Sequence, residues 1–185
     1  EDTNIKIQRK LYSNMENVAA NAVGMSRGDY QDRQHLGLNL FNGSKVKVSY
    51  VEGNSAVTIQ NETQRHDNEP VTSQTIKQGQ SIELTSSYNA TPFARTPVGN
   101  TLEPTILEFE ILDENATKPL ALFHKGDDQA EFISSWQENG GYGVLDSESV
   151  TVLVDHDEIG SLIQSNVPNV ERDFNTFLTW WDDVT

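Results

Sequence analysis

The sequence predicts a mainly β protein: an antiparallel β-sandwich followed by a small mixed α/β subdomain with about three helices. Three observations support this fold class. Several short segments between residues 36 and 112 alternate apolar and polar residues, which places successive side chains on opposite faces of a strand. Turn-forming residues separate these segments, and no helical pattern lies between them. From about residue 118, strand-like runs alternate with amphipathic helical patterns.

The alternating segments predict a β-sandwich domain at residues 26–117. Asn42-Gly43 separates two of them, and both positions tolerate the positive φ of a tight hairpin turn. The segment at 105–112 places acidic residues on one face and Leu, Phe and Ile on the other. The remaining segments with a strand-like pattern are residues 36–41, 45–51, 56–60 and 74–87.

Residues 1–25 are predicted to be a polar lead-in to this domain. The segment is rich in Asn, and its apolar residues have a loose helical spacing: Leu11, Met15, Val18 and Ala22. We expect either a docking helix or a partly ordered segment.

Residues 118–185 are predicted to open a second, α/β domain. After a strand at 119–126, Asp127 can cap a helix that ends at Gly140-Gly141. A hairpin-like pair of strands follows, with Ser147 near its turn. A second helix is expected to start at Asp155, with Asp157 and Glu158 in its first turn. The last helix carries an apolar stripe formed by Val170, Phe174, Phe177 and Trp181.

The charge of the chain restricts its partners. The formal net charge is −15, and residues 121–185 contain 13 acidic and two basic residues. Such a surface repels phosphate backbones, so we expect no nucleic-acid partner and interpret the charge as a solvated face. There is no apolar run near 18 residues, so no membrane span is expected. The chain has no Cys, which excludes disulfides and thiolate chemistry.

Residues 154–160, "VDHDEIG", superficially resemble the zinc signature H-E-x-x-H. The residue after His156 is Asp157, however, and the position of the second ligand is Gly160. The four His, at 35, 66, 124 and 156, include no pair four residues apart. There is also no G-x-S-x-G motif for a Ser nucleophile. We therefore predict no catalytic residue, metal ligand or cofactor in this chain.

Exposed aromatic residues are the candidate binding residues. Trp180 lies outside the apolar stripe of the last helix, and we expect Trp180, Tyr88 and Tyr142 to contact a glycan or another domain. Trp136, Phe93 and Trp181 are expected in the core. Two short motifs, Arg27-Gly28-Asp29 and the N-x-S/T sequons at Asn42, Asn61, Asn89 and Asn115, are interpreted as chance matches.

Five segments resemble, in order, the viral enhancins and their bacterial relatives, the mucin-degrading zinc metallopeptidases of family sixty. The resemblance covers roughly residues 26–185. It lies in "MSRGDYQDRQHLGLNLFNGSKVKVSYVEG", "YNATPFARTPVGNTLEPTILEFEI", "PLALFHKGDDQAEFISSW", "SVTVLVDHDEIGSLI" and the Trp-rich final helix. The H-E-x-x-H motif and the downstream Glu of that family are absent from this chain.

The resemblance implies a secreted or cell-surface protein, of which this chain is the N-terminal region preceding the zinc helix. Zinc is then expected in the full-length parent, and the chain's partners are its own catalytic domain and mucin glycoproteins. The end of the sequence at Thr185, with no cap or tail, suggests a fragment. Two alternatives stay open: an autonomous carbohydrate- or mucin-binding β-sandwich, and a structural adhesin domain.

Overall fold

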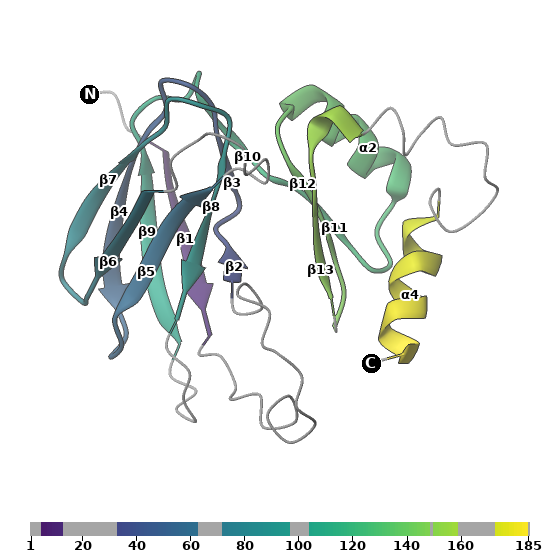
Figure 1. The fold of residues 1–185 in the computed structure, drawn as a ribbon, viewed down its shortest axis with the longest axis horizontal. Coiled ribbons are helices and arrows are strands. Elements are labelled where there is room, and N and C mark those ends of the chain that lie inside the picture. The colour runs from purple at the N-terminus through teal and green to yellow at the C-terminus, as the bar shows by residue number, and fades with distance from the viewer. Residues whose placement is uncertain are drawn as a thin grey trace. The chain divides into compact units, whose positions relative to one another are not determined.

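The computed structural model describes residues 5–12, 33–62, 72–96, 104–148, 150–158 and 173–184. The chain divides into two compact units (Figure 1). Unit 1 comprises Glu1–Leu36 and Leu40–Thr117, and unit 2 comprises Gly37–Asn39 and Lys118–Thr185. The chain therefore enters unit 2 for three residues, returns to unit 1, and crosses again after Thr117.

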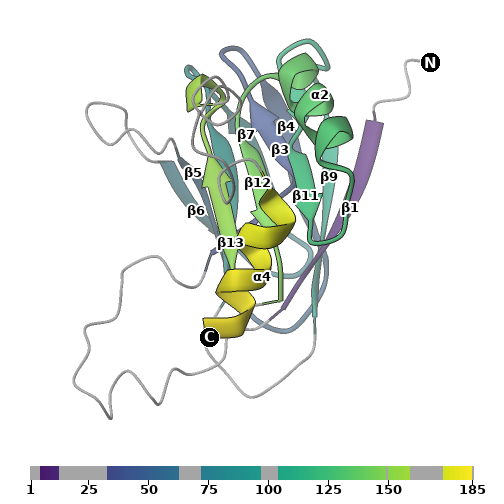
Figure 2. The same cartoon turned by 90° about the vertical axis from the view of Figure 1, so that its right-hand side faces the viewer.

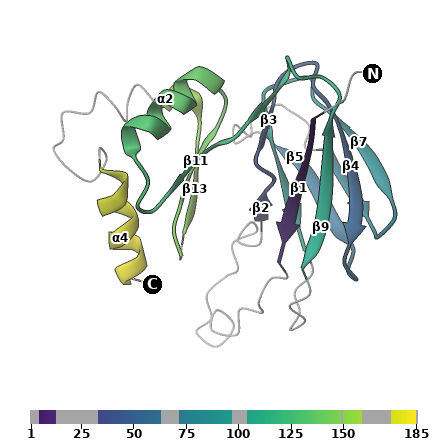
Figure 3. The ribbon, with the colours of Figure 1, turned by 180° about the vertical axis from the view of Figure 1, so that it is seen from behind.

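The first sheet of unit 1 has the order β1-β9-β4-β7, and all its neighbours are antiparallel. The strands are β1 (Ile5–Leu11), β9 (Thr105–Ile111), β4 (Lys45–Glu52) and β7 (Ser81–Thr85). Figure 3 shows β1 beside β9 at one edge of this sheet. Val48 is paired with Phe109, and both are fully buried. The opposite face carries charged residues such as Lys47, which is paired with Glu110. The period-two pattern thus separates a core face from a solvated face.

The second sheet of unit 1 has the order β2-β8-β5-β6, again antiparallel. Its strands are β2 (Arg33–His35), β8 (Thr91–Arg95), β5 (Val57–Glu62) and β6 (Thr72–Ile76). Ile59 and Ala94 are directly paired and fully buried. A two-stranded sheet joins β3 (Leu38–Leu40) to β10 (Thr117–Pro119), and each of these strands contains a crossing between the units.

Unit 2 contains a three-stranded sheet of order β11-β12-β13. These strands are β11 (Ala121–His124), β12 (Gly143–Asp146) and β13 (Thr151–Val154). β11 and β12 are parallel, so the chain needs a crossover between them. Helix α2 (Gln129–Asn139) supplies it. The 3-10 helix η1 (His156–Glu158) follows β13, and α4 (Phe174–Val184) is the last element.

Helices α2 and α4 pack on one face of this sheet (Figure 2). The centre of the contact is aromatic: the ring of Phe123 lies edge-on, 5.5 Å away, to both Phe132 and Phe174. Trp136 and Leu178 complete the core from the two helices. The other face of the sheet has a smaller buried cluster of Leu120, Tyr142 and Val144.

The mainly β fold with antiparallel sheets is confirmed, and four details of the prediction are corrected. The described residues contain two α-helices rather than about three. Ile5–Leu11, predicted as part of a polar lead-in with helical spacing, is the edge strand β1. The cap of α2 is Asp128 instead of Asp127. The buried residues of α4 are Phe174 and Leu178, so the predicted stripe is displaced; Val170 lies outside the described residues.

Candidate functional site

The His residues of the described regions do not form a metal site. His35 is buried, its carbonyl accepts from Arg9 Nε at 3.2 Å, and the guanidinium also contacts its ring. His124 Nδ1 lies 3.4 Å from Asp146 Oδ2, at a largely exposed position. Within the described ranges, no group of three or more His, Cys, Asp or Glu side chains could hold a metal ion. The donor set of these described residues therefore does not fit a zinc ion.

The segment around His156 forms a capped turn. Asp155 Oδ1 accepts from Asp157 N at 3.2 Å, and the Asp155 carbonyl accepts from Glu158 N at 3.0 Å. The Asp155 carboxylate thus caps the start of the 3-10 helix η1, as carboxylates commonly do at helix N-termini. The expected continuation into a longer helix lies beyond residue 158, outside the described residues.

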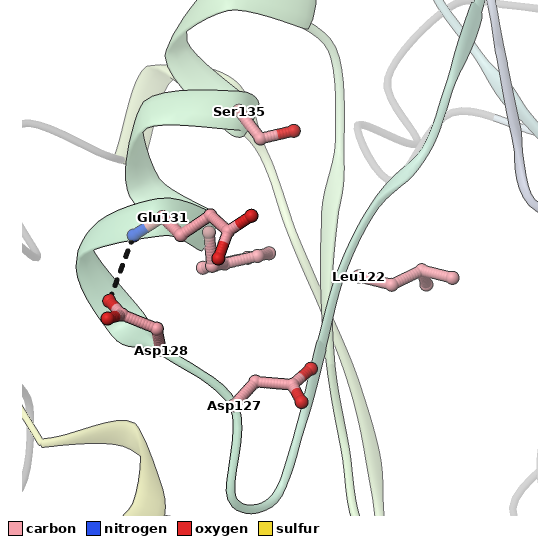
Figure 4. Close-up of a pocket in the computed structure, with 6 residues that line it drawn as sticks. Leu122, Asp127, Asp128, Glu131 and Ser135 are labelled. Carbon is pink, nitrogen blue, oxygen red and sulfur yellow. Dashed lines mark hydrogen bonds between the residues drawn. The ribbon is translucent and has the colours of Figure 1, made fainter.

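A pocket of about 340 Å³ lies in unit 2 beside the start of α2 (Figure 4). Its lining residues are Leu122, Asp127, Asp128, Glu131, Phe132 and Ser135. Two of its three carboxylates are used by the fold itself. Asp128 Oδ1 accepts from the backbone N of Ala130 and Glu131, at 2.8 and 3.1 Å, and Asp127 Oδ2 accepts from His124 N at 2.9 Å. The pocket therefore contains helix-capping groups and lacks a nucleophile paired with a base.

The exposed large apolar side chains among the described residues of unit 2 lie on α4. Trp180 is 55% exposed and Val184 57% exposed, and they are one turn apart. The half-buried Trp181 lies edge-on to both Trp180 and Phe177, with ring centroids 5.3 and 6.4 Å apart. We call Trp180, Trp181 and Val184 the α4 outer surface; the half-buried Phe177 packs against the core of unit 2.

Polar contacts fix α4 to the rest of unit 2. Asp182 accepts from Lys125 Nζ and from Ser147 Oγ, both at 2.7 Å. At the other end of the helix, Phe174 N donates to Gln129 Oε1 at 2.9 Å. The hydrogen bond to Asp182 raises the pKa of Lys125 above its ordinary value. The α4 outer surface is thus displayed by a helix held at both ends.

The three candidate binding residues have different environments. Trp180 is 55% exposed. Tyr142 is only 4% exposed and belongs to a core cluster of unit 2, so it is not available at the surface. Tyr88, in unit 1, is half-buried, and its hydroxyl donates to the Asn61 carbonyl at 3.3 Å.

The other aromatic predictions have mixed outcomes. Trp136 is in the core as predicted, 1% exposed, and its Nε1 donates to the Gly141 carbonyl at 3.0 Å. Phe93 and Trp181 are only half-buried. Of the sequon residues, Asn61 is 1% exposed while Asn42, Asn89 and Asn115 are at the surface. Arg27-Gly28-Asp29 lies outside the described residues.

No protein-family model and no curated protein matches the chain. Its fold is similar to several solved structures of low sequence identity. One is a mutant of a functionally unknown conserved protein from Bacillus anthracis str. Ames, with a TM-score of 0.70, 13% identity and coverage of 97% of this chain and 35% of that chain. A second is the IMPa metallopeptidase from Pseudomonas aeruginosa, with a TM-score of 0.65, 13% identity, and coverage of 92% and 20%.

A third is the M60 catalytic domain of ZmpC from Clostridium perfringens, solved with the sialyl T antigen. Its TM-score is 0.61 at 13% identity, and the match covers 97% of this chain and 38% of that one. The chain thus spans between a fifth and two fifths of the length of these structures. The two-unit fold of this chain is therefore a fold found within M60-type metallopeptidase structures. No described helix is long and apolar enough to cross a membrane.

Proposed function

We propose that this chain is the non-catalytic N-terminal region of a secreted or cell-surface, enhancin-like zinc metallopeptidase that acts on mucin-type glycoproteins. One observation carries the proposal: nearly all of this chain matches the fold of the ZmpC M60 catalytic domain, while covering 38% of it. In this proposal the two four-stranded sheets of unit 1 are the layers of a β-sandwich, and unit 2 opens the peptidase domain.

The zinc of the parent protein would be held by residues outside this chain. The sequence has no H-E-x-x-H motif, and His35 and His124 contact Arg9 and Asp146, respectively. A family-type zinc site would activate water for peptide hydrolysis. The role of this chain is then to scaffold the catalytic domain and to help orient a glycosylated substrate. Structures of IMPa with T-antigen and with an O-glycopeptide support that substrate class.

The α4 outer surface is the proposed contact with the catalytic domain. A half-exposed Trp and Val on one helical face lose water favourably when another apolar surface covers them, by about 25 cal/mol per Å². Because α4 is fixed by Asp182 and Gln129, the surface is preorganised for docking. Tryptophan is also enriched among the residues that dominate protein interfaces.

Expression of this chain and of the complete reading frame tests the proposal. We expect the complete protein to cleave an O-glycosylated peptide in a zinc-dependent reaction, and this chain alone to leave the peptide intact. Cleavage by the isolated chain, or near-stoichiometric zinc that survives dialysis against a weak chelator, would contradict it. A reading frame with no H-E-x-x-H beyond Thr185 would instead favour the alternative, an autonomous carbohydrate-binding or adhesin module.

A further inference from the structure

Three connections of unit 1 meet at one end of its strands (Figure 1). They are residues 41–44 between β3 and β4, 86–90 between β7 and β8, and 112–116 between β9 and β10. β4 is antiparallel to both β7 and β9, which brings the three together. Backbone bonds confirm it: Phe41 N donates to Ala116 O, and Gly43 N to Ser86 O, both at 2.8 Å.

Each connection presents one exposed asparagine: Asn42, Asn89 or Asn115. Across the described residues, no hydrogen bond is found for these three side-chain amides. The buried Asn61 differs, because its Nδ2 donates to Ser86 Oγ at 3.3 Å. An exposed amide retains two donors and one acceptor for a ligand, so this end of unit 1 has a concentration of unused hydrogen-bonding groups.

The backbone beneath these amides is held by specific bonds. Asp113 Oδ1 accepts from the backbone N of Asn115 and Ala116, at 3.0 and 3.2 Å. Ser86 Oγ donates to the Tyr88 carbonyl at 2.6 Å, and the Tyr88 hydroxyl donates to the Asn61 carbonyl. Loops that are already ordered lose less conformational entropy when a ligand binds.

We propose that this end of unit 1 binds a neutral, hydroxyl-rich sugar through Asn42, Asn89 and Asn115, with the half-buried Tyr88, which precedes Asn89 in the same connection, as the aromatic residue of the site. Sugar hydroxyls both donate and accept, which matches primary amides. An aromatic ring accommodates the apolar C–H face of a sugar, and a few placed polar groups fix its orientation. The exposed Glu114 next to Asn115 disfavours an acidic sugar. The sugar class rests on the proposed function; the site itself rests on the loop geometry.

Isotope-labelled chain produced in bacteria, so that the sequons stay bare, allows the site to be mapped by amide chemical shifts. The probes are free N-acetylgalactosamine, a peptide carrying one O-linked N-acetylgalactosamine, and the same peptide without sugar. We expect shifts confined to residues 41–44, 86–90 and 112–116 with both sugar probes and none with the bare peptide. A stronger response to the glycopeptide than to the free sugar would identify glycoprotein as the source.

Asn89→Asp and Asn115→Asp preserve side-chain shape while removing amide donors, and each should weaken binding at least about tenfold. Asn54→Asp is the control, because Asn54 is also exposed but lies in the connection after β4; its Oδ1 accepts from Ser55 Oγ at 3.3 Å. Absent shifts at tens of millimolar sugar, shifts centred on the Trp180 indole, or equal weakening by Asn54→Asp would each overturn the site. Those results would leave cleavage by the complete protein untouched, whereas a missing zinc helix would overturn the scaffold role and leave sugar binding intact.

Discussion

The side chain of Asn39 bonds both backbone groups of Tyr142. Its Oδ1 accepts from Tyr142 N at 2.9 Å, and its Nδ2 donates to Tyr142 O at 3.0 Å. The amide thus replaces a neighbouring strand at the residue just before β12. Asn39 is 1% exposed, and the Asn39 amide atoms lie 2.6–2.9 Å from where a Cβ on Gly141 would be. The three-residue excursion of the chain into unit 2 therefore supplies a specific backbone clamp.

Asn39→Ala should destabilise unit 2 by about 1–3 kcal/mol, because a buried N–H and a buried carbonyl lose their partner. Urea unfolding followed by circular dichroism measures the free energy of unfolding. Asn54→Ala, at an exposed Asn, is the control and should change it by less than about 0.5 kcal/mol. Equal small effects of the two variants would show that water replaces the Asn39 amide without cost.

Shortening the side chains of two nearby residues of α4 to Ala should have very different effects on stability. Leu178 is fully buried in the core of unit 2 and Trp180 is 55% exposed. Leu178→Ala should cost about 2–5 kcal/mol, whereas Trp180→Ala should leave the stability of this chain within about 0.5 kcal/mol. Denaturant unfolding monitored by far-ultraviolet circular dichroism avoids the change in Trp fluorescence.

The same Trp180→Ala change tests the proposed interface. In the complete protein, the catalytic domain would cover the α4 outer surface. Trp180→Ala should therefore lower the melting temperature of the complete protein more than that of this chain alone. A loss of several kcal/mol in the isolated chain would place Trp180 in the core and remove the argument for a covered surface.

The sequence predicts best those strands in which apolar and polar residues alternate regularly. Strands β4 and β9 alternate regularly and were predicted within a residue or two. β1 also alternates, with Ile5, Lys6, Ile7 and Gln8, but the helical spacing from Leu11 onward obscured it. In α4, Phe177 and Leu178 are both apolar neighbours, so the sequence alone could not decide which one faces the sheet.

Long-range pairing sets the features that the sequence did not indicate. Asn39 looks like an outward strand residue until β12 is placed beside it. Tyr142 follows two glycines and resembles an exposed loop aromatic, yet the fold buries it against Leu120 and Val144. The loop-end amides were recognised only as sequons, because their convergence depends on the order of the strands.

Gly143 should not tolerate a side chain, because a Cβ there would lie 2.8 Å from Cε2 of the Trp136 ring. Gly143→Ala is expected to destabilise the chain by about 1–3 kcal/mol through overpacking. A double-mutant cycle isolates the cause: in a Trp136→Leu background the cost of Gly143→Ala should largely disappear. An unchanged cost in that background would assign it to the backbone of β12 instead.

The start of α4 should make stability sensitive to acid. Asp173 Oδ2 accepts from Thr176 Oγ1 at 2.7 Å and Oδ1 accepts from Thr176 N at 3.1 Å. These hydrogen bonds, the side-chain one first, lower the pKa of the Asp173 carboxyl below its ordinary value. A carboxylate with a lowered folded-state pKa stabilises the fold above its unfolded pKa, and loses that contribution as the pH falls through the folded value.

We therefore expect the melting temperature to fall on acidification below about pH 4, with part of the fall belonging to Asp173. Asp173→Asn keeps an acceptor for the helix but cannot ionise, so its melting temperature should be lower than that of the unmodified chain at pH 7, and the difference should shrink by pH 2. Asp183→Asn, an exposed carboxylate in the same helix, provides the same change of charge without a cap. If the two variants follow the same pH profile, net charge rather than the cap of α4 sets the acid response.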